Sequence, residues 1–341
     1  MPANKNIAGQ DLETNHFFSI QALRGIAAIA VVLFHLGLFN IGYAGVDVFF
    51  VISGFVMGTI GHREAPGKFF FKRLIRIAPL YWIVLLMLCA LSLVPNLATK
   101  FGFDAVSLVK SLLIIPYFDV NGHVAPILFI GWTLNYEMFF YVVFAIGLFF
   151  RATNAFSYSA LPLLVAAGML FPAQNALWVT YTNPLLLEFL AGMLLAQMAS
   201  IRGVRMGYFV LVAGILCFAL ASHYNINESQ NVLRVILLGI LATLLVYGAV
   251  AIERAGGWPT FKPFELVGDA SYSLYLWHGL VISTMTRVFP SPSLSSKLLT
   301  VLASIAFALL SFRYLEKPVT NLLRRLIVAI RRDEPKNAVA S

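Results

Sequence analysis

Long apolar blocks recur along this sequence of 341 residues, and they constrain its fold more than any other feature. Each block holds about 17 to 22 residues, which as a helix rising about 1.5 Å per residue cross roughly 30 Å of hydrocarbon. Stretches such as LPLLVAAGMLF do not alternate polar with apolar residues, as the strands of a transmembrane barrel would. We therefore predict an all-α, polytopic membrane protein.

The apolar blocks predict about ten transmembrane helices. Composition agrees, because a chain with 60% hydrophobic and 11% charged residues could not cover a water-facing surface. A shorter apolar stretch near 107–118 contains Lys110 and Pro116, so we expect it to be re-entrant or interfacial and not an eleventh crossing. The ten predicted spans lie near 19–39, 45–60, 74–95, 132–150, 157–171, 184–200, 207–222, 232–252, 271–289 and 297–315.

Lysine and arginine collect in short connecting segments, which predicts the orientation of the chain. With ten crossings these segments fall on one face, and the positive-inside rule makes that face cytoplasmic, together with both termini. We expect a cytoplasmic leader at 1–16, a membrane domain at 17–320 and a basic cytoplasmic tail at 321–341. The basic segments are 62–76, 202–205, the surroundings of Arg254 and Lys262, and 317–332.

The net charge and the cysteine content limit the kinds of partner and cofactor that we expect. The net charge of +9 is explained by anchoring against anionic membrane lipid, so it requires no nucleic acid. Only Cys89 and Cys217 are present, both within apolar blocks, so neither a disulfide framework nor a cysteine-based zinc site is expected. We expect no metal cofactor.

The first span carries two costly polar side chains, Arg24 and His35. Eleven helical steps of about 100° return to nearly the same direction, so the two residues share one face, which we expect to line a polar interior. The second span begins with GVDVFFVISGF and places Asp47 at about the height of His35. A carboxylate there could hold the imidazole in one tautomer and raise its basicity. The alternative is that Asp47 simply caps its helix.

A basic cluster opens the third span in FFFKRLIRIAPLYW. Arg73 and Arg76 are three residues apart and stack on one helix face, with Lys72 beside them. Because Arg24 lies at the same predicted depth, these guanidinium groups could converge on a phosphate group. Ordinary positive-inside anchoring by snorkelling side chains is the alternative.

The fourth span contains Glu137 in WTLNYEMFFY, with Tyr141 one helical turn later. An ionisable residue within a membrane span is a functional candidate by default, and its nearest alternative role is to pair with a cation and lock two helices together. Glu188, near the start of a later span, is weaker evidence for a site.

The ninth predicted span carries Ser271, Tyr275 and His278 at positions i, i+4 and i+7. This spacing places them in one polar stripe on an otherwise apolar helix. We interpret the stripe, together with Tyr141 of the fourth span, as a candidate substrate-binding surface. A lone helical histidine is also commonly a hydrogen-bonded packing residue, and that alternative stays open for His278.

Six blocks of the sequence, in order, resemble the acyltransferase-3 family, whose members are bacterial multi-span O-acyltransferases that modify cell-surface sugars. Within that family the chain most resembles the exopolysaccharide O-acetyltransferases. The resemblance covers about residues 17–320. The blocks are LRGIAAIAVVLFH, GVDVFFVISGF, FKRLIRIAPLYW, WTLNYEMFFY, SYSLYLWH and RYLEKP.

The resemblance implies cytoplasmic acetyl-CoA as acyl donor and a hydroxyl of a polysaccharide or lipid-linked oligosaccharide as acceptor, in the bacterial inner membrane. It implies contact with the polysaccharide synthesis machinery as well. The family's motif histidine falls on His35, its arginine pair on Arg73 and Arg76, and its acidic residue on Glu137. Thr133 stands where the family usually has serine, so a role for that hydroxyl is open.

The reaction needs a base, because a sugar hydroxyl is a poor nucleophile at neutral pH. We assign His35 as this base, tuned by Asp47 or Glu137. In an alternative route His35 carries the acetyl group transiently.

Two functions of other classes stay open at this point. A proton-coupled transporter of a sugar intermediate uses similar intramembrane residues, although the two halves of the chain show no repeat. A structural scaffold for a polysaccharide synthase is the second alternative, and it requires none of these intramembrane polar residues.

Overall fold

Helices account for nearly all of the regular structure. The computed structural model describes residues 17–61, 64–93, 103–198, 203–223, 232–259 and 261–333. Within these ranges the β-structure is a single isolated bridge between Phe118 and Val124, and there is no sheet. The helices are α1 Phe18–His35, α2 Gly45–Ile60, α3 Pro66–Ser92, α4 Ala105–Leu112, α5 Trp132–Phe149, α6 Thr153–Leu170, α7 Ala176–Tyr181, α8 Leu186–Gln197, α9 Val204–Ala221, α10 Val232–Arg254, α11 Lys262–Asp269, α12 Ser271–Val288, α13 Leu294–Ser311 and α14 Lys317–Asp333.

The predicted all-α, polytopic membrane fold is confirmed. Within the described ranges, nine segments are long and apolar enough to cross a membrane, and they contain nine of the ten predicted spans. The remaining predicted span, the ninth, is α12, which is 18 residues long but less apolar, because it contains several serine and threonine residues and His278. The predicted leader 1–16 and the end of the tail, 334–341, lie outside the described residues.

The helix α3 begins earlier than expected, whereas the short helix α4 agrees with the expectation. α3 begins at Pro66, eight residues before the predicted span, because proline suits the first helical turn and the basic segment that follows continues the helix. Its start places Arg73 and Arg76 well inside α3. The helix α4 spans only eight residues, about 12 Å, which is too short to cross the bilayer, in agreement with the expected re-entrant or interfacial segment.

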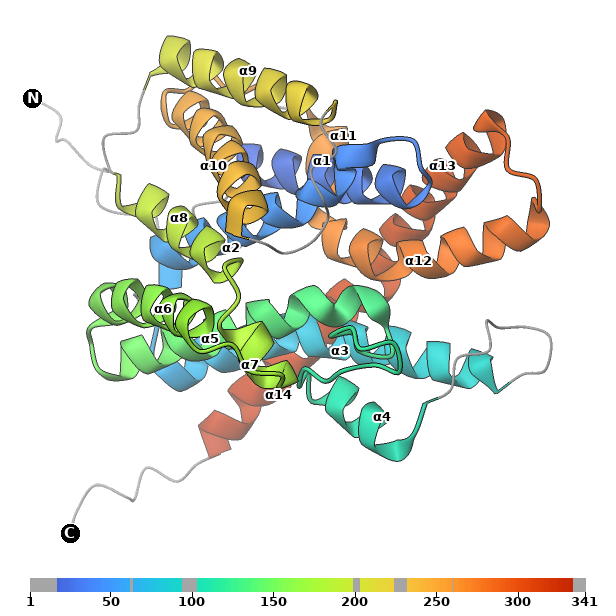
Figure 1. The fold of residues 1–341 in the computed structure, drawn as a ribbon, viewed down its shortest axis with the longest axis horizontal. Coiled ribbons are helices and arrows are strands. Elements are labelled where there is room, and N and C mark those ends of the chain that lie inside the picture. The colour runs from blue at the N-terminus through green and yellow to red at the C-terminus, as the bar shows by residue number, and fades with distance from the viewer. Residues whose placement is uncertain are drawn as a thin grey trace, which may run out of the picture.

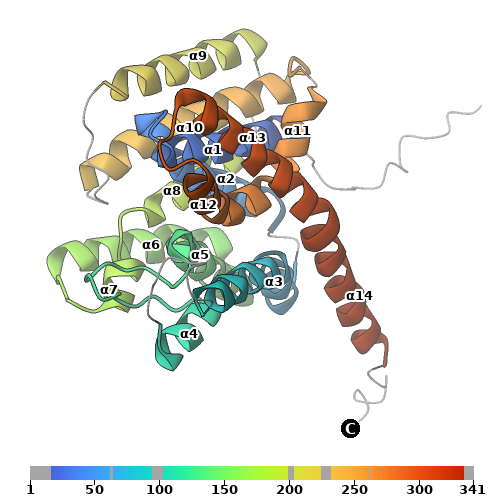
Figure 2. The same ribbon diagram turned by 90° about the vertical axis from the view of Figure 1, so that its right-hand side faces the viewer.

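The helices form two groups (Figures 1 and 2). In Figure 2, α3 to α7 lie below α1, α2 and α8 to α13, and α14 runs from the upper group down to α3, against which it packs. Within the upper group α2 packs against α8 and α10, and α1 packs against α11 and α12. A Cβ at Gly54 of α2 would lie 2.0 Å from the carbonyl oxygen of Phe189 in α8, so only glycine permits this close approach. The tight packing of α2 matters because α2 forms one wall of the site described next.

Candidate functional site

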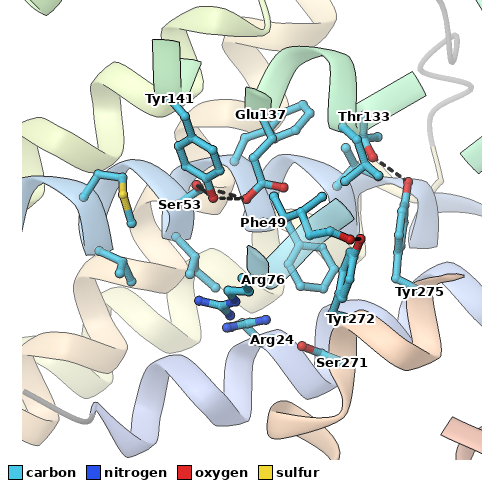
Figure 3. A pocket seen from close by; sticks show the side chains of 17 residues that line it. Arg24, Phe49, Ser53, Arg76, Thr133, Glu137, Tyr141, Ser271, Tyr272 and Tyr275 are labelled. Atoms are coloured by element: carbon cyan, nitrogen blue, oxygen red, sulfur yellow. Dashed lines mark hydrogen bonds between the residues drawn. The ribbon is translucent and has the colours of Figure 1, made fainter. Parts of the chain in front are cut away.

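A cavity of about 770 Å³, partly open to the surface, lies where the two groups of helices meet (Figure 3). Side chains from α1, α2, α3, α5 and α12 line it. The polar ones are Arg24, Ser53, Arg76, Thr133, Glu137, Tyr141, Ser271, Tyr272 and Tyr275, and the others are apolar.

The guanidinium groups of Arg24 and Arg76 face each other at one end of the cavity (Figure 3). The two positive charges repel each other, and neither side chain hydrogen-bonds to any other residue that the structure describes. Glu316 and Glu137 attract Arg24 electrostatically without bonding to it. Two adjacent arginines with free donors are suited to bind an anion such as phosphate.

The other two predicted members of the basic cluster do not line the cavity. Lys72 pairs with Glu64, and its side chain is 44% exposed. Arg73 is buried, its guanidinium lies over the ring of Phe69, and its Nε has no hydrogen-bond partner within the described part of the chain. The expected convergence of three guanidinium groups is therefore reduced to Arg24 and Arg76.

Glu137 lies in the middle of the cavity wall. Its carboxylate accepts hydrogen bonds from the hydroxyl of Tyr141 and, at 3.4 Å, from that of Ser53. Neither partner is a cation, so the structure does not support a simple helix-locking ion pair for Glu137. A carboxylate held by two hydroxyl groups and open to a cavity can accept a proton from a ligand.

Uncharged polar groups form the far end of the cavity. The hydroxyls of Thr133 and Tyr275 lie 2.9 Å apart, and both reach the carbonyl oxygen of Ile130. The hydroxyl of Ser271, which lies at the opposite end beside Arg24 (Figure 3), is fully buried and has no partner in the described ranges. The hydroxyl of Ser271 is therefore free to donate a hydrogen bond to an oxygen atom of a ligand, as an oxyanion of acyl transfer requires. The hydroxyl hydrogens of Thr133 and Tyr275 are already used in bonds to each other and to Ile130, so these two groups offer lone pairs.

His35 and His278 lie beyond the cavity. His35 is exposed at the end of α1, and its Nδ1 donates to the carbonyl oxygen of Val31 at 2.8 Å. His278 is fully buried, and the centroids of the two imidazole rings are 4.9 Å apart. The polar stripe on α12 therefore divides, with Ser271 and Tyr275 in the cavity and His278 continuing it to His35.

The expected pairing of Asp47 with His35 is wrong. Asp47 is fully buried, and its carboxylate lies 2.7 Å from the guanidinium of Arg234 in α10. A full ion pair satisfies this buried charge better than a neutral imidazole at the exposed end of α1. Glu188, which is also buried, acts on Asp47 electrostatically. Asp47 therefore belongs to a polar cluster that joins α2, α8 and α10.

Four residues near the site were missed by sequence reasoning. Ser53 and Tyr272 line the cavity but have ordinary polar side chains, so only their position identifies them. Arg234 lies within a predicted membrane span, and an arginine in such a position is by itself a sign of a buried polar site. Glu316 lies in a π-helical turn, Phe312–Glu316, that directs its carboxylate to the hydroxyl of Ser273 at 2.7 Å.

Comparison with known proteins identifies the family. The model of the acyltransferase domain family matches residues 17–313. The chain belongs to this family. The protein is therefore an acyltransferase, and its apolar helices make it a multi-pass membrane protein. No solved structure matches the chain.

Proteins similar in sequence to this acyltransferase are named for polysaccharide production or for acyl transfer. The exopolysaccharide production protein ExoZ of Rhizobium meliloti is 35% identical over 301 residues, covering 84% of this chain and 91% of the relative. The peptidoglycan O-acetyltransferase OatA of Listeria monocytogenes is 27% identical, and the match covers 88% of this chain but only 55% of the relative. The putative membrane-bound transacylase BcsY of Komagataeibacter xylinus is 28% identical, over 79% of this chain and 74% of the relative.

The geometry suits acyl transfer. The cavity has two arginines at one end, a carboxylate in the middle and uncharged hydroxyl groups at the far end, in the order Arg24, Glu137, Tyr275. A group bound by its negative charge at the arginines would extend its other end toward the hydroxyls. None of the described residues forms a cluster of three or more His, Cys, Asp or Glu side chains placed to hold a metal ion.

Proposed function

We propose that this acyltransferase moves an acetyl group from acetyl-CoA to a hydroxyl of a surface polysaccharide or of its lipid-linked repeat unit. The protein acts in the bacterial inner membrane, with both termini in the cytoplasm. The observation that carries the proposal is the pair of arginines, Arg24 and Arg76, facing each other in a cavity that continues to the hydroxyls of Thr133 and Tyr275.

The donor is inferred from the charge distribution along the cavity. Acetyl-CoA combines a phosphorylated, anionic end with a long neutral arm that ends in the thioester. Arg24 and Arg76 bind the anionic end, and the apolar residues between them and Tyr275 accommodate the arm. The separation of Arg24 and His35 along α1, about 16 Å, is close to the length of an extended pantetheine arm.

The acceptor is inferred from the relatives. One relative is named for exopolysaccharide production and another for O-acetylation of peptidoglycan, and both of these polymers are cell-surface glycans. The stronger match, over nearly the full length of both chains, favours an exopolysaccharide. We further propose that the protein works beside the machinery that assembles this polymer.

His35 acts as the base in this proposal. Its Nδ1 hydrogen is held by the carbonyl oxygen of Val31, which leaves a lone pair on Nε2. Because the side chain is exposed at the end of α1, an acceptor hydroxyl can reach it from outside the helix bundle. The hydroxyl of Ser271, which has no other partner in the described ranges, stabilises the oxyanion as the thioester carbonyl is attacked.

A reconstituted assay tests the proposed function. Purified protein in lipid vesicles is given acetyl-CoA labelled in the acetyl group, together with the polysaccharide of cells that lack the protein. Transfer of label to the glycan as a base-labile ester supports the proposal. NMR of the polysaccharide from cells with and without the protein identifies the sugar and the hydroxyl. If the two polysaccharides carry identical O-acetyl groups, the proposal is wrong.

A further inference from the structure

The two histidines of α1 and α12 form a contact that the mechanism above does not use. The ring centroids of His35 and His278 lie 4.9 Å apart, with the ring planes inclined by 58°. The ring of His278 also lies 5.9 Å from that of Tyr275, which lines the cavity. His278 therefore stands between the cavity wall and His35.

Hydrogen bonds fix the same tautomer in both rings. Nδ1 of His278 lies 2.7 Å from the carbonyl oxygen of Tyr275, and Nδ1 of His35 lies 2.8 Å from that of Val31. A carbonyl oxygen only accepts hydrogen bonds, so in each ring Nδ1 carries a hydrogen, and in the neutral form of the ring Nε2 carries a lone pair. Each ring thus has one acceptor nitrogen left.

The acceptor nitrogen of His278 is in an unusual position. Its Nε2 is buried and has no hydrogen-bond partner within the described part of the chain. A buried acceptor without a donor destabilises the folded protein, and a phenylalanine would pack in the same space without this penalty. Of the titratable side chains around His278, His35 is the one that acts on it electrostatically.

We propose that His278 is a positioning residue for His35, and that its Nε2 accepts a hydrogen bond from the imidazolium that forms on His35 during acyl transfer. This inference rests on the proposed function, because it concerns the base of that reaction. In the resting protein both Nε2 atoms are acceptors, so the hydrogen bond forms only after His35 has gained a proton. Ring centroids 4.9 Å apart allow a hydrogen bond of about 3 Å between the two Nε2 atoms when these nitrogens face each other.

The proton balance of the step is as follows. The acceptor hydroxyl oxygen forms a bond to the thioester carbon, and its proton passes to Nε2 of His35. The imidazolium keeps its Nδ1 hydrogen on Val31 and offers the new Nε2 hydrogen to His278. The carbon–sulfur bond then breaks, and the proton moves from His35 to the departing thiolate. His278 stays neutral throughout.

Three substitutions of His278 separate acceptor geometry from packing. His278→Gln places an amide oxygen near the former Nε2 and keeps an acceptor there. His278→Asn reaches only as far as the former Nδ1, and His278→Phe keeps the ring shape without any acceptor. The matched control is His123→Phe, which removes an exposed loop histidine with 74% of its side chain accessible. Each protein is purified in detergent and checked for monodispersity and acetyl-CoA affinity.

Measurement of turnover distinguishes a hydrogen-bonding role of His278 from a packing role. We expect kcat to fall about 10- to 100-fold in the Asn and Phe variants, the effect of losing one hydrogen bond to a charged group, with KM for acetyl-CoA unchanged. The Gln variant and the His123→Phe control should stay within about threefold of the wild type. Phe turnover equal to that of the wild type, or equal losses in Gln and Phe with weakened acetyl-CoA binding, would overturn the inference.

A second measurement does not depend on transfer activity. Diethylpyrocarbonate modifies neutral imidazole, and mass spectrometry follows its addition to His35 at neutral pH. If His278 stabilises the imidazolium, His35 is modified faster in the Phe variant than in the wild type or the Gln variant. Identical rates in all three proteins contradict the inference even where no acetyl transfer is detected. A wild type that does not transfer from acetyl-CoA argues separately against the proposed function.

Discussion

The carboxylate of Asp47 in α2 and the guanidinium of Arg234 in α10 form a buried ion pair at 2.7 Å, with 0% and 5% of the two side chains exposed. This pair fixes α2, the helix that contributes Phe49, Phe50 and Ser53 to the cavity wall. The charges that enclose the site therefore serve two purposes. Asp47 and Arg234 hold a helix in place, whereas Arg24 and Arg76 remain available for a ligand.

Arg234→Leu should destabilise the protein by about 3 to 5 kcal/mol, because it leaves the charge of Asp47 buried without a partner. The thermal midpoint of the detergent-solubilised protein measures this effect. The double substitution Asp47→Asn with Arg234→Gln removes both charges and should recover much of the loss. Transfer activity per folded molecule should be near normal in the double variant. Its complete loss would indicate that Asp47 takes part in the chemistry.

Arg76→Gln should weaken acetyl-CoA binding about 10- to 100-fold, since it removes a charged donor from the anion-binding end of the cavity. Lys72→Gln provides the matched control on the same helix, because Lys72 pairs with Glu64 away from the cavity. Its affinity should stay within about twofold of the wild type. Calorimetry on the purified proteins measures both, and an equal loss in the two variants would favour general membrane anchoring.

Glu137→Gln should lower kcat by about 100-fold or more without weakening acetyl-CoA binding, if the carboxylate exchanges a proton with the bound substrate. The amide keeps a hydrogen-bond acceptor for Tyr141 and Ser53, so the cavity wall should be preserved. Tyr141→Phe removes one of those two bonds and should have a smaller effect. Rapid-quench measurement of acetyl transfer compares the losses of kcat in the two variants. A larger loss in Tyr141→Phe than in Glu137→Gln would assign the main role to Tyr141.

His35→Ala should abolish O-acetyl groups on the surface polysaccharide while the protein is still inserted and expressed at a normal level. The side chain is exposed at the end of α1, so its loss removes little packing. Expression is followed by immunoblotting of membranes and acetylation by NMR of the isolated polymer. Full acetylation in this variant would reject His35 as the base.

The arrangement of Arg24 and His35 shows how far sequence periodicity reaches. Eleven residues bring both side chains to one face of α1, and both indeed lie toward α12, where Ser271 lines the cavity with Arg24 and His278 contacts His35. The periodicity of one helix cannot tell where a cavity ends. That boundary depends on Tyr275, whose ring fills the space beside His278.

Asp47 shows what sequence periodicity does not predict, namely the helix that receives a given side chain. Its height in the second span suggested His35 as a partner, yet α2 faces α10 at this position and presents Asp47 to Arg234. Residues 187 positions apart are joined here by helix packing alone. A single sequence contains no information on which of several neighbouring helices receives a given side chain.

The apolar blocks by themselves determined that this chain forms a polytopic helical membrane protein, because only helices satisfy the backbone hydrogen bonds of such segments in lipid. The same sequence marked Arg24, Arg76, Glu137 and Tyr275, since polar side chains are costly in hydrocarbon and are retained for a reason. Only the tertiary structure decided which of them share a cavity. Packing between helices sets the rotation and depth of each one, and these depend on contacts made across the whole bundle.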